Sequence, residues 1–150
     1  VLWLDHGYLE GDDTDAHIDT LARFAGPDAI VFQACDDPGD SHFAELGAMG
    51  EEIAALRTTD GKPYRLFPLP WAQPIVDEGR RLAASYANFL IINGAVLMPA
   101  YGDAADAAAA EVLATAFPDR EIVQVPCRSL IWQNGSLHCI TMQLPEGILA

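Results

Sequence analysis

The sequence contains few basic residues, because 8 lysines and arginines stand against 22 aspartates and glutamates and give a net charge of −14. A surface this acidic repels nucleic acids and anionic membranes, so we expect neither as a partner. A small cationic partner is attracted by the same charge. The acidity also has a plainer explanation, since excess carboxylates keep many globular proteins dissolved.

Long apolar runs are also missing. A membrane-spanning helix needs about 20 consecutive apolar residues, and no run approaches that length although 51% of the residues are hydrophobic. The chain opens at Val1 without the basic segment of a secretion signal. Its 150 residues fit one globular domain. Because no initiator methionine is present, we expect residues 1–150 to be part of a longer chain.

Cysteine is scarce and odd in number, and its three positions lack the spacing of a disulfide framework. Free thiols favour a reducing compartment, so we expect a cytoplasmic protein. A single free cysteine is usually a small buried hydrophobic residue, which is the role expected for Cys35 and Cys127. Cys139 is expected on a short strand that leaves a tight turn at Gly135, where its thiol projects into a cleft.

The neighbour of this cysteine, His138, is expected to be structural. Adjacent residues of a strand point to opposite faces of the sheet, so the imidazole of His138 would face away from the thiol of Cys139. Any lowering of the thiol pKa is therefore assigned to the surrounding pocket.

The apolar pattern predicts the order strand, strand, helix, strand twice. In the first half, apolar runs at residues 21–24 and 29–34 flank a turn, a helical period covers 41–56, and a strand covers 64–69. In the second half, strands at 89–92 and 95–99 flank Asn93-Gly94, followed by a helix over 104–116 and a strand over 121–125. Between them, residues 70–84 are too irregular for an element and are expected to form a surface loop.

Repeated units of this kind usually bury their faces against neighbours, as in a ring. We therefore expect an α/β fold made of about two complete ββαβ units, with flanking strands at residues 1–4 and around Cys139. Such a piece of a ring would have open edges.

An acidic segment near the start holds Asp12, Asp13, Asp15 and Asp19 together with His17. Carboxylates this close repel one another unless a metal ion or an organic cation lies among them. His17 and Asp19 are two residues apart, which in an extended segment places both side chains on one side. The alternative is a solvated acidic turn at a helix start, where Asp is favoured by the helix dipole.

Metal sites fit this segment poorly. A calcium loop starting at Asp13 lacks its glycine and has Phe24 where the twelfth-position glutamate belongs. Zinc needs clustered His or Cys, and the only such neighbours are His138 and Cys139. We expect no metal and no cofactor. An organic cation fits better, because a guanidinium carbon is attacked by a thiolate while carboxylates hold the cation.

Three segments in order resemble those of one enzyme family. Residues 11–19, 84–90 and 137–143 are similar to the histidine motif, the central signature and the nucleophile motif of the agmatine deiminase and bacterial-type peptidylarginine deiminase family. These are guanidine-modifying hydrolases with the pentein α/β propeller fold. The resemblance covers nearly the whole chain and corresponds to the C-terminal part of such an enzyme.

The resemblance implies a role for each site residue. Cys139 would be the nucleophile, and His17 would protonate the departing ammonia and then activate water. Asp19 would hold the guanidinium, and Asp13 would meet the far end of the substrate. The implied reaction converts agmatine to N-carbamoylputrescine and ammonia, a step toward putrescine and the polyamines.

Departures from the family pattern leave alternatives open. Ala16 stands where the family commonly has glycine, and residues 134–136 are less glycine-rich than in agmatine-specific members. Deimination of peptidyl-arginine is therefore the first alternative, and a non-catalytic binding module of the same fold is the second. The family's remaining acidic residues lie in its N-terminal part, so residues 1–150 alone should be inactive. Self-association into a homo-oligomer is left open.

Overall fold

The computed structural model describes residues 1–12, 17–145 and 147–148. In chain order the elements are η1 (Ile18–Thr20), β1 (Ala22–Gly26), β2 (Ala29–Gln33), α1 (Phe43–Ala55), β3 (Arg65–Leu69), β4 (Val76–Asp77), β5 (Arg80–Arg81), β6 (Leu90–Ile92), β7 (Ala95–Ala100), α2 (Ala105–Ala116), β8 (Glu121–Pro126) and η2 (Ile131–Gln133), where η marks a 3₁₀-helix. Of the helices in these ranges, none is long and apolar enough to cross a membrane.

The ββαβ unit occurs twice, as predicted. In the first unit β1 pairs antiparallel with β2, and β2 pairs in parallel with β3 after the crossover through α1. In the second unit β6 pairs antiparallel with β7, and β7 pairs in parallel with β8 after α2. The two sheets have the same strand order, β1-β2-β3 and β6-β7-β8.

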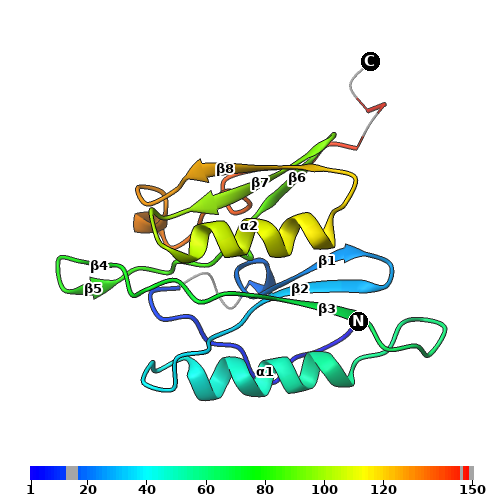
Figure 1. The fold of residues 1–150 in the computed structure, drawn as a ribbon, viewed down its shortest axis with the longest axis horizontal. Helices are drawn as coiled ribbons and strands as arrows, with labels where there is room; N and C mark the ends of the chain where they lie inside the picture. Colours follow the sequence, from blue (N-terminus) through cyan, green and yellow to red (C-terminus); the bar gives the residue numbers. More distant parts are fainter. Residues whose placement is uncertain (13–16, 146, 149–150) are drawn as a thin grey trace.

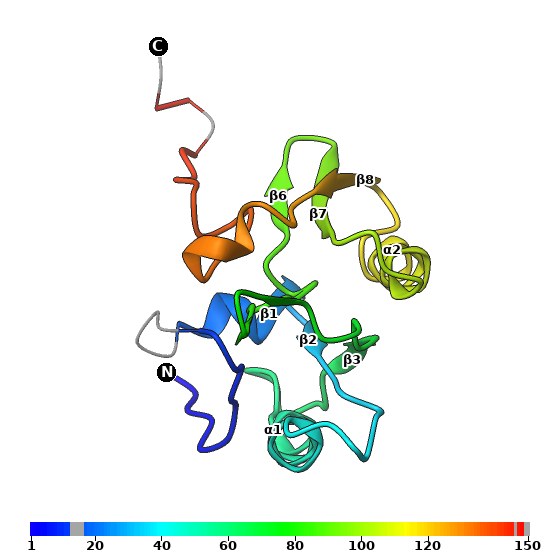
Figure 2. The same cartoon turned by 90° about the vertical axis from the view of Figure 1, so that its left-hand side faces the viewer.

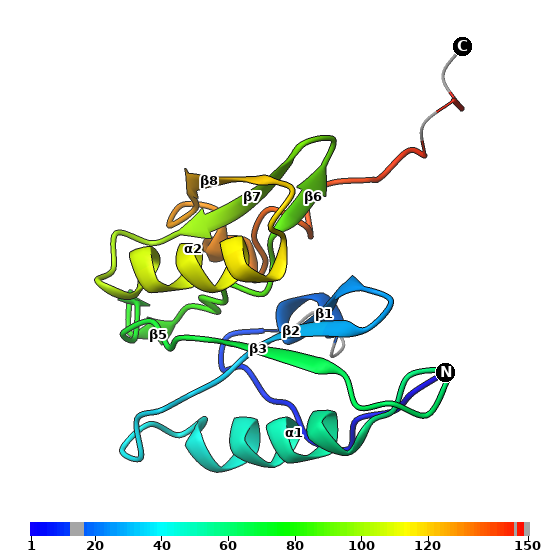
Figure 3. The same cartoon turned by 45° about the vertical axis from the view of Figure 1, so that its right-hand side comes forward.

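The units stack in layers, with α2 between the two sheets and α1 on the outer face of the first sheet (Figures 1 and 3). All five residues of β2 are buried, because this strand is covered from both sides. The buried side of α2 carries Asp106, Ala109, Leu113 and Ala116, and its two alanines are small enough to let the helix lie close to the sheets. The larger hydrophobic core therefore joins both units and includes Tyr86 and Phe89, which lie between them in the sequence.

Three expectations about the connecting segments are wrong. Residues 1–4 form no strand, and residues 137–140 form turns instead of the strand expected around Cys139. Residues 70–84 contain the hairpin β4–β5, whose turn places Glu78 and Gly79 at φ 49° and 76°. Positive φ at both turn positions is typical of the tight hairpins that suit twisted strands. The fold is mixed α/β with three small sheets, and the closed propeller stays a prediction.

Candidate active site

Cys139 lies in the tight turns of residues 137–140 that follow η2. η2 ends at Asn134, whose φ of 67° is left-handed and reverses the chain. A Cβ atom added to Gly135 would lie 2.6 Å from Cβ and 2.7 Å from Sγ of Cys139, so only glycine fits there. The backbone thus passes directly beside the thiol and fixes the position from which it projects.

The side chain of Asn88 connects this turn to the rest of the molecule. Its Oδ1 accepts hydrogen bonds from the backbone N–H of Ser136 at 3.0 Å and of Cys139 at 3.3 Å. Its Nδ2 lies 3.2 Å from Sγ of Cys139 and donates to Oδ2 of Asp19 at 3.0 Å. With 1% of its surface exposed, Asn88 acts as a buried junction for both candidate residues.

Asp19 meets the thiol through one carboxylate oxygen. Oδ2 lies 2.7 Å from Nδ1 of His138 and 3.3 Å from Sγ of Cys139, in addition to its bond from Asn88. No hydrogen bond from the described residues reaches the other oxygen, Oδ1. Burial alone would raise the pKa of Asp19, but hydrogen bonds from His138, Cys139 and Asn88 outweigh it and hold this pKa below its usual value.

The thiol of Cys139 is kept protonated by the same arrangement. Partial burial of the sulfur and then the negative charge of Asp19 raise the pKa of this thiol above its usual value, although Cys139 is an exposed residue. Sγ is therefore placed to donate its proton to Asp19. Cys35 and Cys127 are both free and buried, as predicted.

The expectation that His138 faces away from Cys139 is wrong. It depended on a strand, whereas a turn brings both side chains to the same side, where they share Asp19. The imidazole of His138 and the thiol compete for the same oxygen of Asp19. No alternation rule applies to a turn, so the sequence pattern could not place His138.

His17 is exposed and precedes η1 as its N-cap residue, two positions before Asp19. Its backbone oxygen accepts a hydrogen bond from Oγ1 of Thr20 at 3.1 Å. No hydrogen bond joins its imidazole to the described part of the chain. Asp13 lies outside the described residues. The roles predicted for His17 and Asp13 stay predictions.

Residues next to Asn88 and Asp19 are fixed by buried hydrogen bonds. Oγ of Ser85 donates to the backbone oxygen of Thr20 at 2.6 Å, and the backbone N–H of Tyr86 donates to Oε1 of Gln33 at 2.9 Å. Arg23 donates to the backbone oxygen of Phe89 at 2.9 Å and lies over its ring. The segment of Asn88 is thus held by strands β1 and β2 of the first unit.

The second unit is followed by the turn that carries Cys139. Figure 2 shows the turn after β8, which includes η2, facing the chain around η1. Asp19 comes from the start of the first unit, Asn88 from the connection and Cys139 from the end of the second. The site therefore forms only when the two units are stacked.

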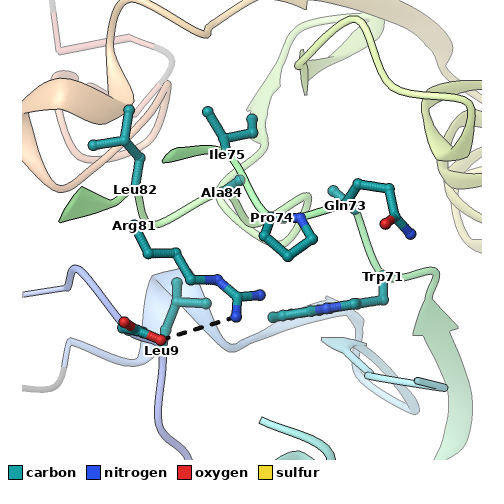
Figure 4. Close-up of a pocket in the computed structure, with 10 residues that line it drawn as sticks. Leu9, Trp71, Gln73, Pro74, Ile75, Arg81, Leu82 and Ala84 are labelled. Atoms are coloured by element: carbon teal, nitrogen blue, oxygen red, sulfur yellow. Dashed lines mark ion pairs between the residues drawn. The ribbon is translucent and has the colours of Figure 1, made fainter. Parts of the chain in front are cut away.

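A separate small hollow is lined by residues 9–10, 71–75, 81–82 and 84. Figure 4 shows Arg81 extending toward Trp71, and the dashed line marks its ion pair with Glu10 at 3.9 Å. Neither Asp19 nor Cys139 lines it. Within residues 1–12, 17–145 and 147–148, no cluster of three or more His, Cys, Asp and Glu side chains is arranged to hold a metal ion.

The chain is similar to known proteins in sequence and in structure. The sequence model of the family described as Porphyromonas-type peptidyl-arginine deiminase matches residues 1–145. An agmatine deiminase from Pseudomonas putida is 33% identical over 99% of this chain and 45% of its own length. The chain therefore spans less than half of the length of such relatives.

Two solved structures are similar over most of the chain. A Porphyromonas gingivalis protein with the provisional name arginine deiminase is 56% identical, with a TM-score of 0.95 over 98% of this chain and 43% of its own. A C. jejuni agmatine deiminase with substrate bound is 43% identical, with a TM-score of 0.83 over 91% of this chain and 39% of its own.

Proposed function

Because the chain belongs to the Porphyromonas-type peptidyl-arginine deiminase family, we propose that it is part of a C–N hydrolase that deiminates a guanidino substrate through Cys139. The observation that carries the proposal is the 3.3 Å distance between Sγ of Cys139 and Oδ2 of Asp19. A nucleophile and a carboxylate at this distance can both reach one planar cation.

Binding would use the second oxygen of Asp19. A guanidinium carries only hydrogen-bond donors and stays protonated at any biological pH. One of its N–H groups would donate to Oδ1 of Asp19, which receives no hydrogen bond from the described residues. Since Oδ2 of the same carboxylate already contacts the thiol, this bond places the guanidinium carbon beside sulfur.

Substrate charge would also activate the thiol. The negative charge of Asp19 raises the pKa of Cys139, and a bound guanidinium compensates that charge, so the thiol pKa falls when substrate arrives. The thiol then loses its proton to solvent, and the thiolate attacks the guanidinium carbon and forms a C–S bond. The C–N bond breaks, and ammonia leaves with a proton from His17.

Hydrolysis would complete the cycle. His17, now neutral, takes a proton from water, and the water oxygen attacks the carbon bound to sulfur. The C–S bond breaks, the thiolate of Cys139 returns, and a ureido group is released. The net reaction consumes one water and one guanidinium group and yields one urea group and one ammonium ion.

Agmatine is the proposed substrate and N-carbamoylputrescine the product, because the curated relatives carry the name agmatine deiminase. Asp13 is proposed to bind the primary amine at the other end of agmatine. Peptidyl-arginine is the second candidate, favoured by the description of the family. A non-catalytic binding module is the third, and the presence of Asp19 and Cys139 at one site argues against it.

The whole activity is a proposal for the complete protein. Because the chain spans under half of its relatives' length, we propose that the rest of a propeller supplies the remaining acidic groups, and that residues 1–150 alone release no ammonia. The free, buried thiols of Cys35 and Cys127 support the cytoplasm as its proposed location.

The test is an ammonia-release assay on the complete protein with agmatine and an arginyl peptide as separate substrates. Cys139→Ala should abolish release from either substrate, and a haloacetamidine should label Cys139 in the unsubstituted protein by mass spectrometry. Turnover that survives Cys139→Ala contradicts the nucleophile assignment. Labelling without turnover of any guanidino compound favours the binding module.

A further inference from the structure

We propose that the neighbouring arginines of β5, Arg80 and Arg81, form a bracket that holds residues 10–12 and the turn carrying Cys139 at a fixed separation. The inference rests on the proposed function, because it assigns positioning residues to that site. We call Arg80 and Arg81 the arginine bracket. Figure 1 shows the hairpin β4–β5 at one edge of the molecule, at a height between the two units.

Arg80 holds the nucleophile side. Its Nη1 donates to Oδ1 of Asn134 at 3.0 Å, and its Nη2 donates to the backbone oxygen of Trp132 at 2.7 Å. The guanidinium lies 5.3 Å from the centre of the Trp132 ring, and Nε1 of Trp132 donates back to Asp77 on β4 at 2.9 Å. Both strands of the hairpin therefore contact η2 or the residue that follows it.

The contacts of Arg80 lie one residue from Gly135, which lies against the thiol of Cys139. Asn134, which Arg80 contacts, adopts the left-handed conformation that ends η2. The next residue, Gly135, passes so close to Cys139 that an added Cβ would lie 2.7 Å from Sγ. A shift of Asn134 is therefore transmitted through Gly135 to the thiol.

Arg81 holds the other side. It donates from Nη1 to Oδ1 of Asp40 at 3.2 Å and from Nη2 to Oδ2 at 2.6 Å, and it forms an ion pair with Glu10 at 3.9 Å. The side chains of Asp40 and Arg81 are only 3% and 15% exposed, so this two-pronged pair is shielded from water. It is a fixed point and not a solvated surface pair.

Asp40 connects Arg81 to residues 10–12 through His42. Nδ1 of His42 bonds to Oδ1 of Asp40 at 2.6 Å, which leaves Nε2 to accept the backbone N–H of Glu10 at 2.8 Å. A Cβ added to Gly11 would lie 2.4 Å from the backbone oxygen of Arg81, so the segment runs directly along β5. Oδ2 of Asp12 accepts a hydrogen bond from Oγ1 of Thr20 at 3.0 Å, which joins residues 10–12 to the neighbour of Asp19.

The hairpin is built to transmit position between the two sides. Adjacent strand residues point in opposite directions, so Arg80 and Arg81 reach opposite neighbours from one short strand. The pairing of Val76 with Arg81 and Asp77 with Arg80 closes the hairpin, and the backbone N–H of Leu82 donates to Ile75 at 2.8 Å at its base.

A purely local role for each arginine is the competing explanation. In that case Arg80 stabilises η2, Arg81 neutralises Asp40, and neither affects the segment bound by the other. The two explanations differ in whether releasing one arginine disturbs both segments.

The experiment uses the complete protein with Arg80→Met, Arg81→Met and the double variant. Arg65→Met is the matched control, since the exposed Arg65 at the start of β3 also makes two hydrogen bonds to a carboxylate, that of Asp28, and lies over a ring, that of Phe67. Three quantities are measured: kcat and KM for the guanidino substrate, the alkylation rate of Cys139 by iodoacetamide, and hydrogen exchange at residues 8–12 and 132–139.

We expect each single variant to lower kcat by about tenfold or more with KM within about threefold, because misplacing a catalytic group affects the chemical step more than binding. The kcat of the double variant should lie within about twofold of the kcat of the slower single variant, because the loss of either arginine already abolishes the fixed separation. Each single variant should speed hydrogen exchange in both segments. Arg65→Met should change none of these quantities.

Removing Arg81 alone leaves the buried carboxylate of Asp40 without its arginine and with hydrogen bonds from His42 and Trp71 only, which can prevent folding. Asp40→Asn combined with Arg81→Met removes both charges and provides the second test of that side. Arg80→Lys keeps the charge but loses the two-pronged contact, so it should remain defective if geometry matters and recover if charge alone matters.

The bracket is refuted if exchange rises only in the segment next to the substituted arginine, or if the effects on kcat multiply in the double variant. Recovery of full kcat in Arg80→Lys also refutes it. An unsubstituted protein that releases no ammonia refutes the proposed function, whereas the exchange and alkylation measurements still decide the bracket.

Discussion

Sγ of Cys139 lies 3.3 Å from Oδ2 of Asp19, although 120 positions separate the two residues in the sequence. Under the proposed function, this contact couples the protonation of the nucleophile to the carboxylate charge that would hold the substrate. A carboxylate beside a thiol disfavours the thiolate, so the empty site keeps its nucleophile protonated. This coupling gives the first prediction.

Asp19→Asn should change two reactions of Cys139 in opposite directions. Removing the negative charge lowers the raised pKa of the thiol, so alkylation by neutral iodoacetamide at pH 7 should become several-fold faster. Deimination should fall by about a hundredfold or more, because the guanidinium loses its carboxylate. Slower alkylation at pH 7 in Asp19→Asn contradicts the electrostatic explanation.

Asn88→Asp should distinguish the role of the Asn88 amide oxygen, which accepts hydrogen bonds, from that of its nitrogen, which donates them. The carboxylate can still accept the N–H groups of Ser136 and Cys139, but it cannot donate to Asp19 or to sulfur. Its charge adds to that of Asp19, so alkylation of Cys139 at pH 7 should be slower than in the unsubstituted protein.

Asn88→Ala is the companion variant. It leaves the two backbone N–H groups without an acceptor, which should lower the free energy of unfolding by about 1–3 kcal/mol. Alkylation as fast in Asn88→Asp as in the unsubstituted protein would show that Asn88 does not act on the thiol.

Gly135→Ala should inactivate the enzyme, because the new methyl group would meet Cβ and Sγ of Cys139 at 2.6 and 2.7 Å. We expect a loss of at least about tenfold in kcat from the displaced nucleophile. Gly47→Ala is the control, since Gly47 lies in helix α1 with nothing within 4 Å of the added Cβ. That control should keep full activity and gain about 0.5–1 kcal/mol of stability. Ammonia release and thermal melting of both variants give the comparison.

Asp40→Asn should destabilise the protein in a pH-dependent way. Burial alone would raise the pKa of Asp40, but hydrogen bonds from Arg81, His42 and Trp71 hold it well below its usual value. The resulting stability is fully present above the unfolded pKa, near 4, and is lost as the pH falls through the lowered folded pKa.

The expected loss at pH 7 is about 3–5 kcal/mol, the cost of breaking a buried pair. Thermal melting of Asp40→Asn and the unsubstituted protein from pH 7 down to pH 2 measures it. A gap that widens toward low pH contradicts the sign of this argument.

Repetition made the core of the fold predictable. Apolar periodicity placed both ββαβ units within one or two residues of their observed bounds, because β2, α1, β7 and α2 each bury a regular set of side chains. The hairpin β4–β5 was missed because its two-residue strands carry mostly charged side chains and show no alternation. Long-range contacts hold it in place.

The site was predictable in its residue types but not in its contacts. Cys139 and Asp19 come together, yet Asn88 and His138 were not foreseen as their partners. Asn88 carried a usable signal, since a single amide within an apolar run must find partners when buried. His138 carried none, because only the turn at residues 137–140 gives it the same direction as Cys139.

Helix α2 packs on β3 of the other unit as well as on its own sheet. Neither repeat can therefore be cut out as an autonomous piece, since removing one would strip the apolar cover from the other. Because the two units share this helix, the chain should melt in a single step.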